Sequence, residues 1–93
     1  MKQINIITKS ELGEKALKKN LKEYSRMPVH QKVMLSSTIK RRVTKEPLTL
    51  ILTIKNNFLA KAMDENVFIN GLRKSMDEEG VKEKKDYEVV IVE

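Results

Sequence analysis

Lysines and arginines are the residues of this chain whose spacing most clearly suggests a binding chemistry. At about 100° per residue, a helix following Ser10 would place five of them on one stripe: Lys15, Lys18, Lys19, Lys22 and Arg26. Leu17, Leu21 and Tyr24 lie on the opposite side of that helix, so the stripe should face solvent. Such a stripe can bind phosphates, because each neutralised phosphate releases a counterion. It is also typical of a solvated helix face, and that alternative stays open.

A second basic cluster, Lys40-Arg41-Arg42 with Lys45, is expected at the tip of a hairpin. That tip should lie at the same end of the domain as the start of the first helix, where Lys9 can join the cluster. Arginines there can fork onto phosphate. The sequence therefore predicts contacts with nucleic-acid phosphates, DNA or RNA, through nine residues: Lys15, Lys18, Lys19, Lys22, Arg26, Lys40, Arg41, Arg42 and Lys45. The expected central strands carry no aromatic residue on which a base could stack, which favours backbone contact with little sequence preference.

Residues that could catalyse a reaction are few and scattered. His30 is the only histidine and there is no cysteine, so the usual pairs of nucleophile and base cannot be assembled. Asp64 and Asp77 would lie about 220° apart around a continuous helix, which does not bring them to one metal ion. Three glycines are too few and too dispersed for a phosphate-binding loop. We expect no enzyme, no cofactor, no metal site and no small-molecule substrate.

Length and composition favour one folded domain spanning residues 1–93. Apolar residues make up 40% of the chain and charged residues 34%, a balance typical of globular domains. No apolar run is long enough for a membrane span or a signal peptide, and no disulfide can form, so we expect a cytoplasmic protein with no membrane partner. The net charge of +6 is uneven: residues 1–55 hold 13 Lys or Arg against 4 Asp or Glu, and the remainder hold 6 against 9.

The elements that should position these side chains alternate between strands and helices. Period-two patterns predict strands over residues 2–8, 48–55 and 87–92. A helix should begin after Thr8 or Ser10, either of which is a good cap, and end near Tyr24 or Arg26. Residues 32–43 favour a strand because of their β-branched side chains, although Leu35, Ile39 and Val43 are also spaced as in a helix.

A second helix is expected between Asn56 and Glu79, followed by Gly80 as its C-terminal cap. The sequence leaves open whether this helix is continuous or broken near Asn66 or Asn70-Gly71. The resulting order of elements predicts an α+β ferredoxin-like βαββαβ plait. Such a plait has a four-stranded antiparallel sheet, with its first and third strands central and two helices on one face. It hosts many functions and identifies none.

The uncovered face of that sheet supports an alternative function. In this alternative the protein is a homo-oligomer, such as a homodimer, that serves as an interaction or regulatory module. The apolar side chains of the uncovered face are expected to be Ile7, Met34, Ile51, and either Val90 or Tyr87 with Val89. A further alternative treats residues 48–80 as a strand and two short helices. That arrangement resembles the ribbon–helix–helix family, which implies a DNA-binding dimer reading the major groove through Thr49, Thr53 and Lys55.

Overall fold

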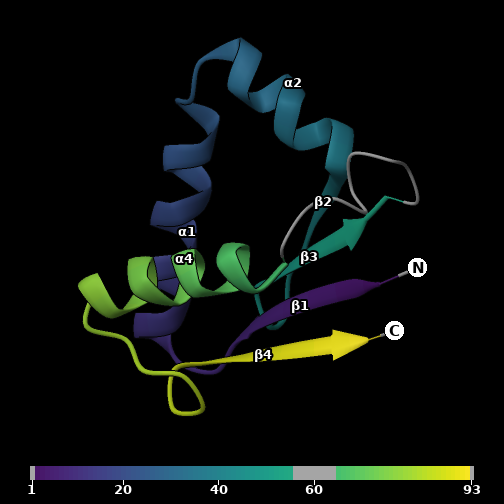
Figure 1. Ribbon diagram of the computed structural model, residues 1–93. Helices are drawn as coiled ribbons and strands as arrows, with labels where there is room; N and C mark the ends of the chain where they lie inside the picture. The colour runs from purple at the N-terminus through teal and green to yellow at the C-terminus, as the bar shows by residue number, and fades with distance from the viewer. Residues whose placement is uncertain (1, 56–64, 93) are drawn as a thin grey trace.

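The computed structural model describes residues 2–55 and 65–92. Their elements follow the order β1 (Gln3–Thr8), α1 (Glu11–Ser25), α2 (Val29–Thr38), β2 (Ile39–Thr44), β3 (Thr49–Ile54), α4 (Glu65–Glu78) and β4 (Tyr87–Val92). The strands form one antiparallel sheet in the order β2-β3-β1-β4. The described part of the chain is therefore an α+β fold with a four-stranded antiparallel sheet and three helices (Figure 1).

The two central strands, β1 and β3, supply the middle of the core, as their hydrophobicity predicts. Ile4 pairs with Leu52 and Ile6 with Leu50, and each of these side chains is at most 2% exposed. Paired residues point to the same side of a sheet, so these four share one face. On that face they form a single apolar cluster with helix residues that include Leu17, Ile69, Leu72 and Met76. The opposite face, which we call the open face, carries Gln3, Asn5 and Ile7 of β1.

Because β3 is hydrogen-bonded to β1 on one side and β2 on the other, it has no free edge. In the ribbon–helix–helix alternative this strand would pair with its copy in a second chain. That alternative is therefore wrong for this fold.

Helix α2 is the main departure from the expected order of elements. The prediction of a strand over residues 32–43 is wrong as far as Thr38, and only Ile39–Thr44 is a strand. The carbonyl of Pro28 accepts the N–H of Lys32 at 3.1 Å and so starts helical hydrogen bonding. In the last turn the Ser36, Ser37 and Thr38 hydroxyls each donate to the carbonyl three residues earlier. Local hydrogen bonding thus outweighs β propensity, and the expectation of only two helices is wrong.

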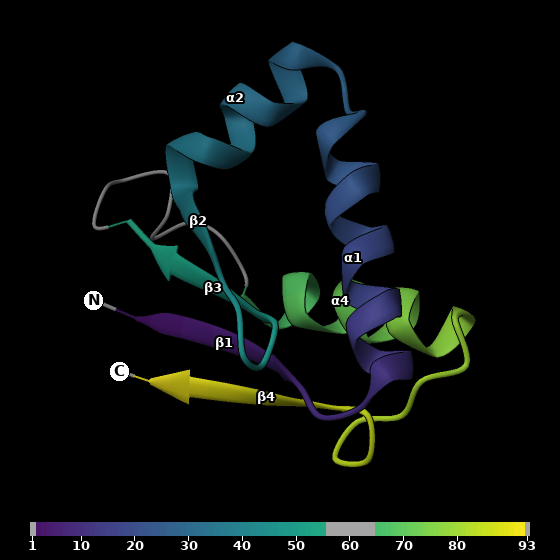
Figure 2. The same cartoon turned by 180° about the vertical axis from the view of Figure 1, so that it is seen from behind.

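Helices α1 and α2 form an arch that rises from the end of β1 and returns to the start of β2 (Figures 1 and 2). No residue of α2 is buried, and Val29, Val33 and Met34 are 75%, 60% and 68% exposed. Met34, expected on the open face, belongs to this helix instead. The core is therefore built from the sheet, α1, α4 and the segment before β4, with α2 outside it.

Helix α4 is continuous from Glu65 to Glu78, so Asn70-Gly71 does not break it. A break near Asn66 is not tested, because the residues that precede Glu65 lie outside the described part of the chain. Ile69, Leu72 and Met76 are 3%, 8% and 0% exposed, and burial of this one face favours a single helix. Gly80 follows with a φ of 79°, as expected for a residue that ends a helix. The part of the predicted helix over residues 56–64 lies outside the described residues.

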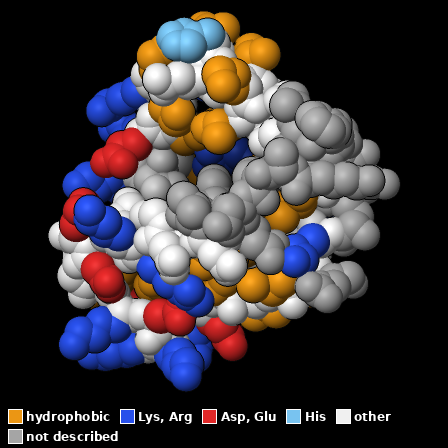
Figure 3. Space-filling view, in the orientation of Figure 1, with side chains coloured by type: hydrophobic (Ala, Val, Ile, Leu, Met, Phe, Trp, Pro, Cys, Tyr) orange, Lys and Arg blue, Asp and Glu red, His pale blue; other side chains and the backbone are white. Residues whose placement is uncertain are grey.

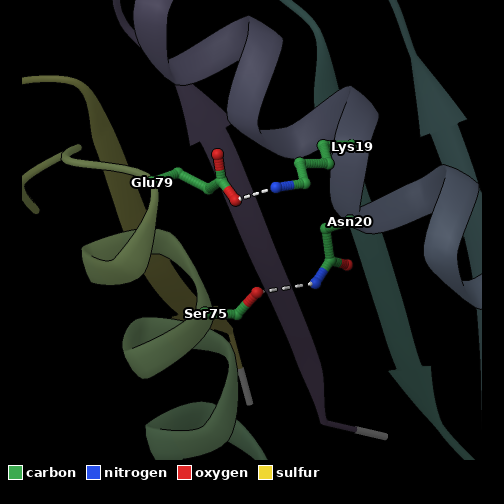
Figure 4. A network of polar contacts seen from close by, with 4 residues as sticks. All are labelled: Lys19, Asn20, Ser75 and Glu79. Carbon is green, nitrogen blue, oxygen red and sulfur yellow. Dashed lines mark hydrogen bonds and ion pairs between the residues drawn. The ribbon is translucent and has the colours of Figure 1, made fainter.

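Two polar contacts join α1 to the C-terminal half of α4 (Figure 4). The amide of Asn20 lies 3.5 Å from the Ser75 hydroxyl, and the Lys19 amine forms an ion pair with Glu79, just beyond the helix. Both contacts lie on the side of α1 next to α4, where they help to set the position of one helix against the other.

The corner between β1 and α1 is held by Asp86, which precedes β4. Ser10 caps α1 by accepting the N–H of Gly13, and its hydroxyl donates to Asp86 Oδ1 at 2.8 Å. Asp86 Oδ2 accepts the backbone N–H of Lys82 at 3.0 Å, and the Asp86 carbonyl accepts the N–H of Lys9 at 2.8 Å. Ser10, rather than Thr8, is therefore the cap, and the aspartate ties the first helix to the last strand.

We expect this corner to make stability depend on acid pH. The Lys82 N–H, and then the Ser10 hydroxyl, hold the pKa of Asp86 below its usual 3.8. A depressed pKa means that the carboxylate stabilises the fold above the unfolded-state pKa, and that this stabilisation is lost as the pH falls towards the folded-state pKa. Asp86→Asn should therefore have a lower thermal midpoint at neutral pH and a flatter midpoint curve between about pH 5 and pH 3. Thermal unfolding followed by circular dichroism tests this, and parallel curves for the two proteins would contradict it.

Candidate nucleic-acid interface

The basic residues of β2 point to both sides of the sheet. Arg41 pairs with Leu52 and so faces the helices, whereas Lys40 pairs with Thr53 and Arg42 with Ile51. Because neighbouring residues alternate along a strand, Lys40 and Arg42 project from the open face. The prediction that this cluster lies at the tip of a hairpin is wrong for Lys40, Arg41 and Arg42. Lys40 lies at the end of β2 furthest from the turn, and only Lys45 lies in that turn.

Lys40 and Arg42 border a groove on the open face, which we call the open-face groove. It has a volume of about 310 Å³ and is lined by Gln3, Lys40, Arg42, Ile51, Thr53 and Lys55. Lys40 and Arg42 are exposed, while the Lys55 amine donates to the carbonyl of Ser36. None of these six lining residues carries a carboxylate. The groove thus combines cations with hydroxyl and amide groups that can bind an anion.

Four of the groove's six lining residues, Gln3, Ile51, Thr53 and Lys55, were not among the nine predicted contacts. Side chains alternate along β3, so Thr53 and Lys55 lie on the same side as Ile51. The period-two pattern of the sequence therefore indicated that these side chains share one face. Gln3 reaches the groove because it pairs with Thr53, and that pairing depends on the register between β1 and β3.

The five cations of the predicted stripe are all exposed; four of them lie on α1, and Arg26 follows as its C-terminal cap. The stripe shares its surface with carboxylates, however. Lys18 forms an ion pair with Glu14 at 3.1 Å, and Lys19 pairs with Glu79, which raises the pKa of Lys19 through their hydrogen bond and then through its charge. Figure 3 shows acidic and basic side chains alternating over this side of the molecule. Mixed charge lowers the attraction of this surface for a polyanion.

The nine predicted residues therefore do not form one surface. The helix stripe lies on the outer side of the helical layer, because Gly13, Ala16 and Leu17 occupy the buried side of α1. Lys40 and Arg42 lie on the opposite face of the domain, and Arg41 lies between the sheet and the helices. A short nucleic-acid segment would contact either the stripe or the open-face groove.

The open face also carries apolar side chains. Ile7, Ile51 and Val90 lie on it as expected, because Ile51 and Val90 both pair with Asn5 and Ile7 pairs with Thr49 and Glu88. Tyr87 and Val89 pair with Thr8 and Ile6 and so face the helices. The apolar residues lie towards β1 and β4, whereas the cations lie towards β2.

Side chains considered for catalysis are dispersed. His30 is exposed on α2, and the hydroxyls of residues 36–38 are engaged by backbone carbonyls of their own helix. Among residues 2–55 and 65–92 there is no group of three histidines or carboxylates that could hold a metal ion. Within the same two ranges, no helix combines the length and apolarity that crossing a membrane requires.

Comparison with protein-family models, with curated proteins and with solved structures finds no match for this chain. The inference of a function therefore rests on the geometry of the described residues.

Proposed function

We propose that this protein is a small, non-enzymatic, cytoplasmic binding protein that contacts the phosphates of a nucleic acid. The supporting observation is the open-face groove, in which Lys40 and Arg42 project side by side and none of the described lining residues carries a carboxylate. Arginine and lysine are the residues that proteins use most for phosphate contacts, and Thr53 and Gln3 can add neutral hydrogen bonds. As part of the same proposal, the fold is a ferredoxin-like plait with α2 inserted before β2, in which β1 and β3 are central.

We expect the nucleic acid to contact mainly the open-face groove, and the α1 stripe only secondarily. Lys18 and Lys19 of the stripe already have carboxylate partners, whereas the groove lining offers Lys40 and Arg42 none. Contacts to phosphate alone carry no sequence information, so DNA and RNA of any sequence should bind comparably, and affinity should fall with salt.

Charge reversal at two matched pairs of sites tests this placement. Lys40→Glu with Arg42→Glu should weaken binding of a labelled single-stranded oligonucleotide by about tenfold or more and reduce the salt slope by about 1.5. Lys15→Glu with Lys22→Glu changes the net charge equally but alters only the stripe, so its effect should be smaller. Fluorescence anisotropy across salt concentrations measures both. Equal losses in the two variants, a larger loss in the stripe variant, or no binding of the unmodified protein at low salt would contradict the proposal.

The alternative is a homodimer, or larger homo-oligomer, through the open face. The apolar Ile7, Ile51 and Val90 favour it, because apolar side chains gathered on one uncovered face are typical of interfaces. Such a dimer would cover the side of the sheet next to β4, and its sedimentation coefficient would fall on dilution. A monomer at all concentrations would exclude it.

A further inference from the structure

A second hollow lies on the helix side of the sheet, between the sheet, α1, α2 and α4; we call it the interlayer cavity. It has a volume of about 590 Å³, within the range of about 300–1,000 Å³ typical of small-molecule sites. Its apolar wall is formed by Met27, Leu35, Leu50, Leu52 and Leu72. In Figure 3 a hollow opens beneath α2, with hydrophobic side chains at its rim and a basic side chain inside it.

Arg41 contributes the cation to this cavity. Its guanidinium carbon lies 3.4 Å from the centroid of the Tyr24 ring, which covers one face of the group. Burial lowers the pKa of Arg41, an effect partly offset by Tyr24, but a guanidinium remains charged in proteins. Among the described residues no carboxylate forms an ion pair with it; Glu23 also lines the cavity, but it is exposed and makes no ion pair with Arg41.

A half-buried guanidinium beside an apolar wall has a defined chemical complement. Its N–H donors form their strongest hydrogen bonds with an anionic oxygen, and pairing is most favourable where water is partly excluded. Met27 and Leu35, the partly exposed apolar residues of the lining, favour an apolar body attached to that anion. Asn20 adds a neutral amide to the lining.

We propose that the interlayer cavity binds a small organic anion with an apolar body, its carboxylate or sulfonate on Arg41 and its body against Met27 and Leu35. This site is independent of the nucleic-acid proposal, because Arg41 faces the helices and Arg42 faces the opposite side of the sheet. The two proposals can therefore fail separately.

Two dyes with the same aromatic skeleton test the role of the charge. 8-Anilinonaphthalene-1-sulfonate carries a sulfonate, and N-phenyl-1-naphthylamine does not. In fluorescence titrations the anionic dye should bind with one saturable site, about tenfold more tightly than the neutral one, as a charge-assisted hydrogen bond implies. Arg41→Met should remove that preference, whereas Arg42→Met, the matched control on the open face, should keep it within about twofold.

Gly71→Leu tests the location without removing a charge. Gly71 lines the cavity, and a Cβ built there meets no atom of the described residues within 4 Å, so leucine can enter the space and the helix gains a better helix former. We expect the variant to remain folded and to lose affinity for both dyes by about tenfold. Equal binding of the two dyes by the unmodified protein, loss of preference in Arg42→Met, retained preference in Arg41→Met, unchanged affinity in Gly71→Leu, or absence of saturable binding would each overturn the proposal.

Discussion

Replacing Gly13 by alanine should destabilise the fold by about 3 kcal/mol, at the upper end of the usual cost of overpacking. A Cβ at this position would lie 2.0 Å from the carbonyl oxygen of Asp86 and 2.9 Å from its carbonyl carbon. Both atoms belong to the backbone, so no side-chain rotation can relieve the contact. Either α1 or the segment before β4 must move, and that movement would disturb the bonds from Ser10 and Lys9 to Asp86.

Gly71→Ala is the matched control, because Gly71 also lies within a helix but has no atom of the described part of the chain within 4 Å of a built Cβ. Alanine is the better helix former, so this variant should be more stable than the unmodified protein by about 0.5–1 kcal/mol. Urea unfolding followed by circular dichroism gives both free energies. If Gly13→Ala were neutral or stabilising, helix α1 would not approach the segment before β4 as closely as described.

The approach of Gly13 to Asp86 illustrates what the sequence alone does not reveal. The two residues are far apart in the chain, and nothing in the polar residues around Asp86 indicates that its side chain is buried. Strands β1, β3 and β4, the start of α1 and the end of α4, by contrast, follow from local pattern. Alternation in residues 48–55 gives the orientation of β3. Ser10 marks the start of α1 through its side-chain hydroxyl, and Gly80 marks the end of α4 through its backbone conformation.

Residues 29–44 show why the basic cluster was only partly predictable. Their β-branched side chains are compatible with a strand throughout, and the position at which helix gives way to strand depends on hydroxyls bonding the last helical turn. Once the strand begins at Ile39, period two separates Arg41 from Lys40 and Arg42. Which of them faces the helices is then set by pairing with Leu52, a non-local contact. The nine predicted cations were therefore identified by residue type. Assigning Arg41 to one side of the sheet, and Lys40 and Arg42 to the other, needed the register of β2 against β3.

Two neighbouring isoleucines on β1 allow the two faces of the sheet to be compared directly. Ile6 is 0% exposed and lies in the core opposite Leu50, whereas Ile7 lies on the open face. Ile6→Ala should cost about 3 kcal/mol through lost burial and a cavity, lowering the thermal midpoint by roughly 15 °C. Ile7→Ala should cost less than about 1 kcal/mol in a monomer, because water already reaches that side chain.

The same pair of variants also separates the two proposed functions. In an open-face homodimer, Ile7 would be covered by the partner, so its replacement would weaken association and its apparent cost would change with protein concentration. In a monomer whose open face is reserved for nucleic acid, the cost would be the same at every concentration. Thermal unfolding over a hundredfold range of concentration distinguishes the cases, with Ile6→Ala as the reference whose large effect persists in both. Equal costs for the two variants in a protein that sediments as a monomer would contradict the assignment of Ile7 to an uncovered face.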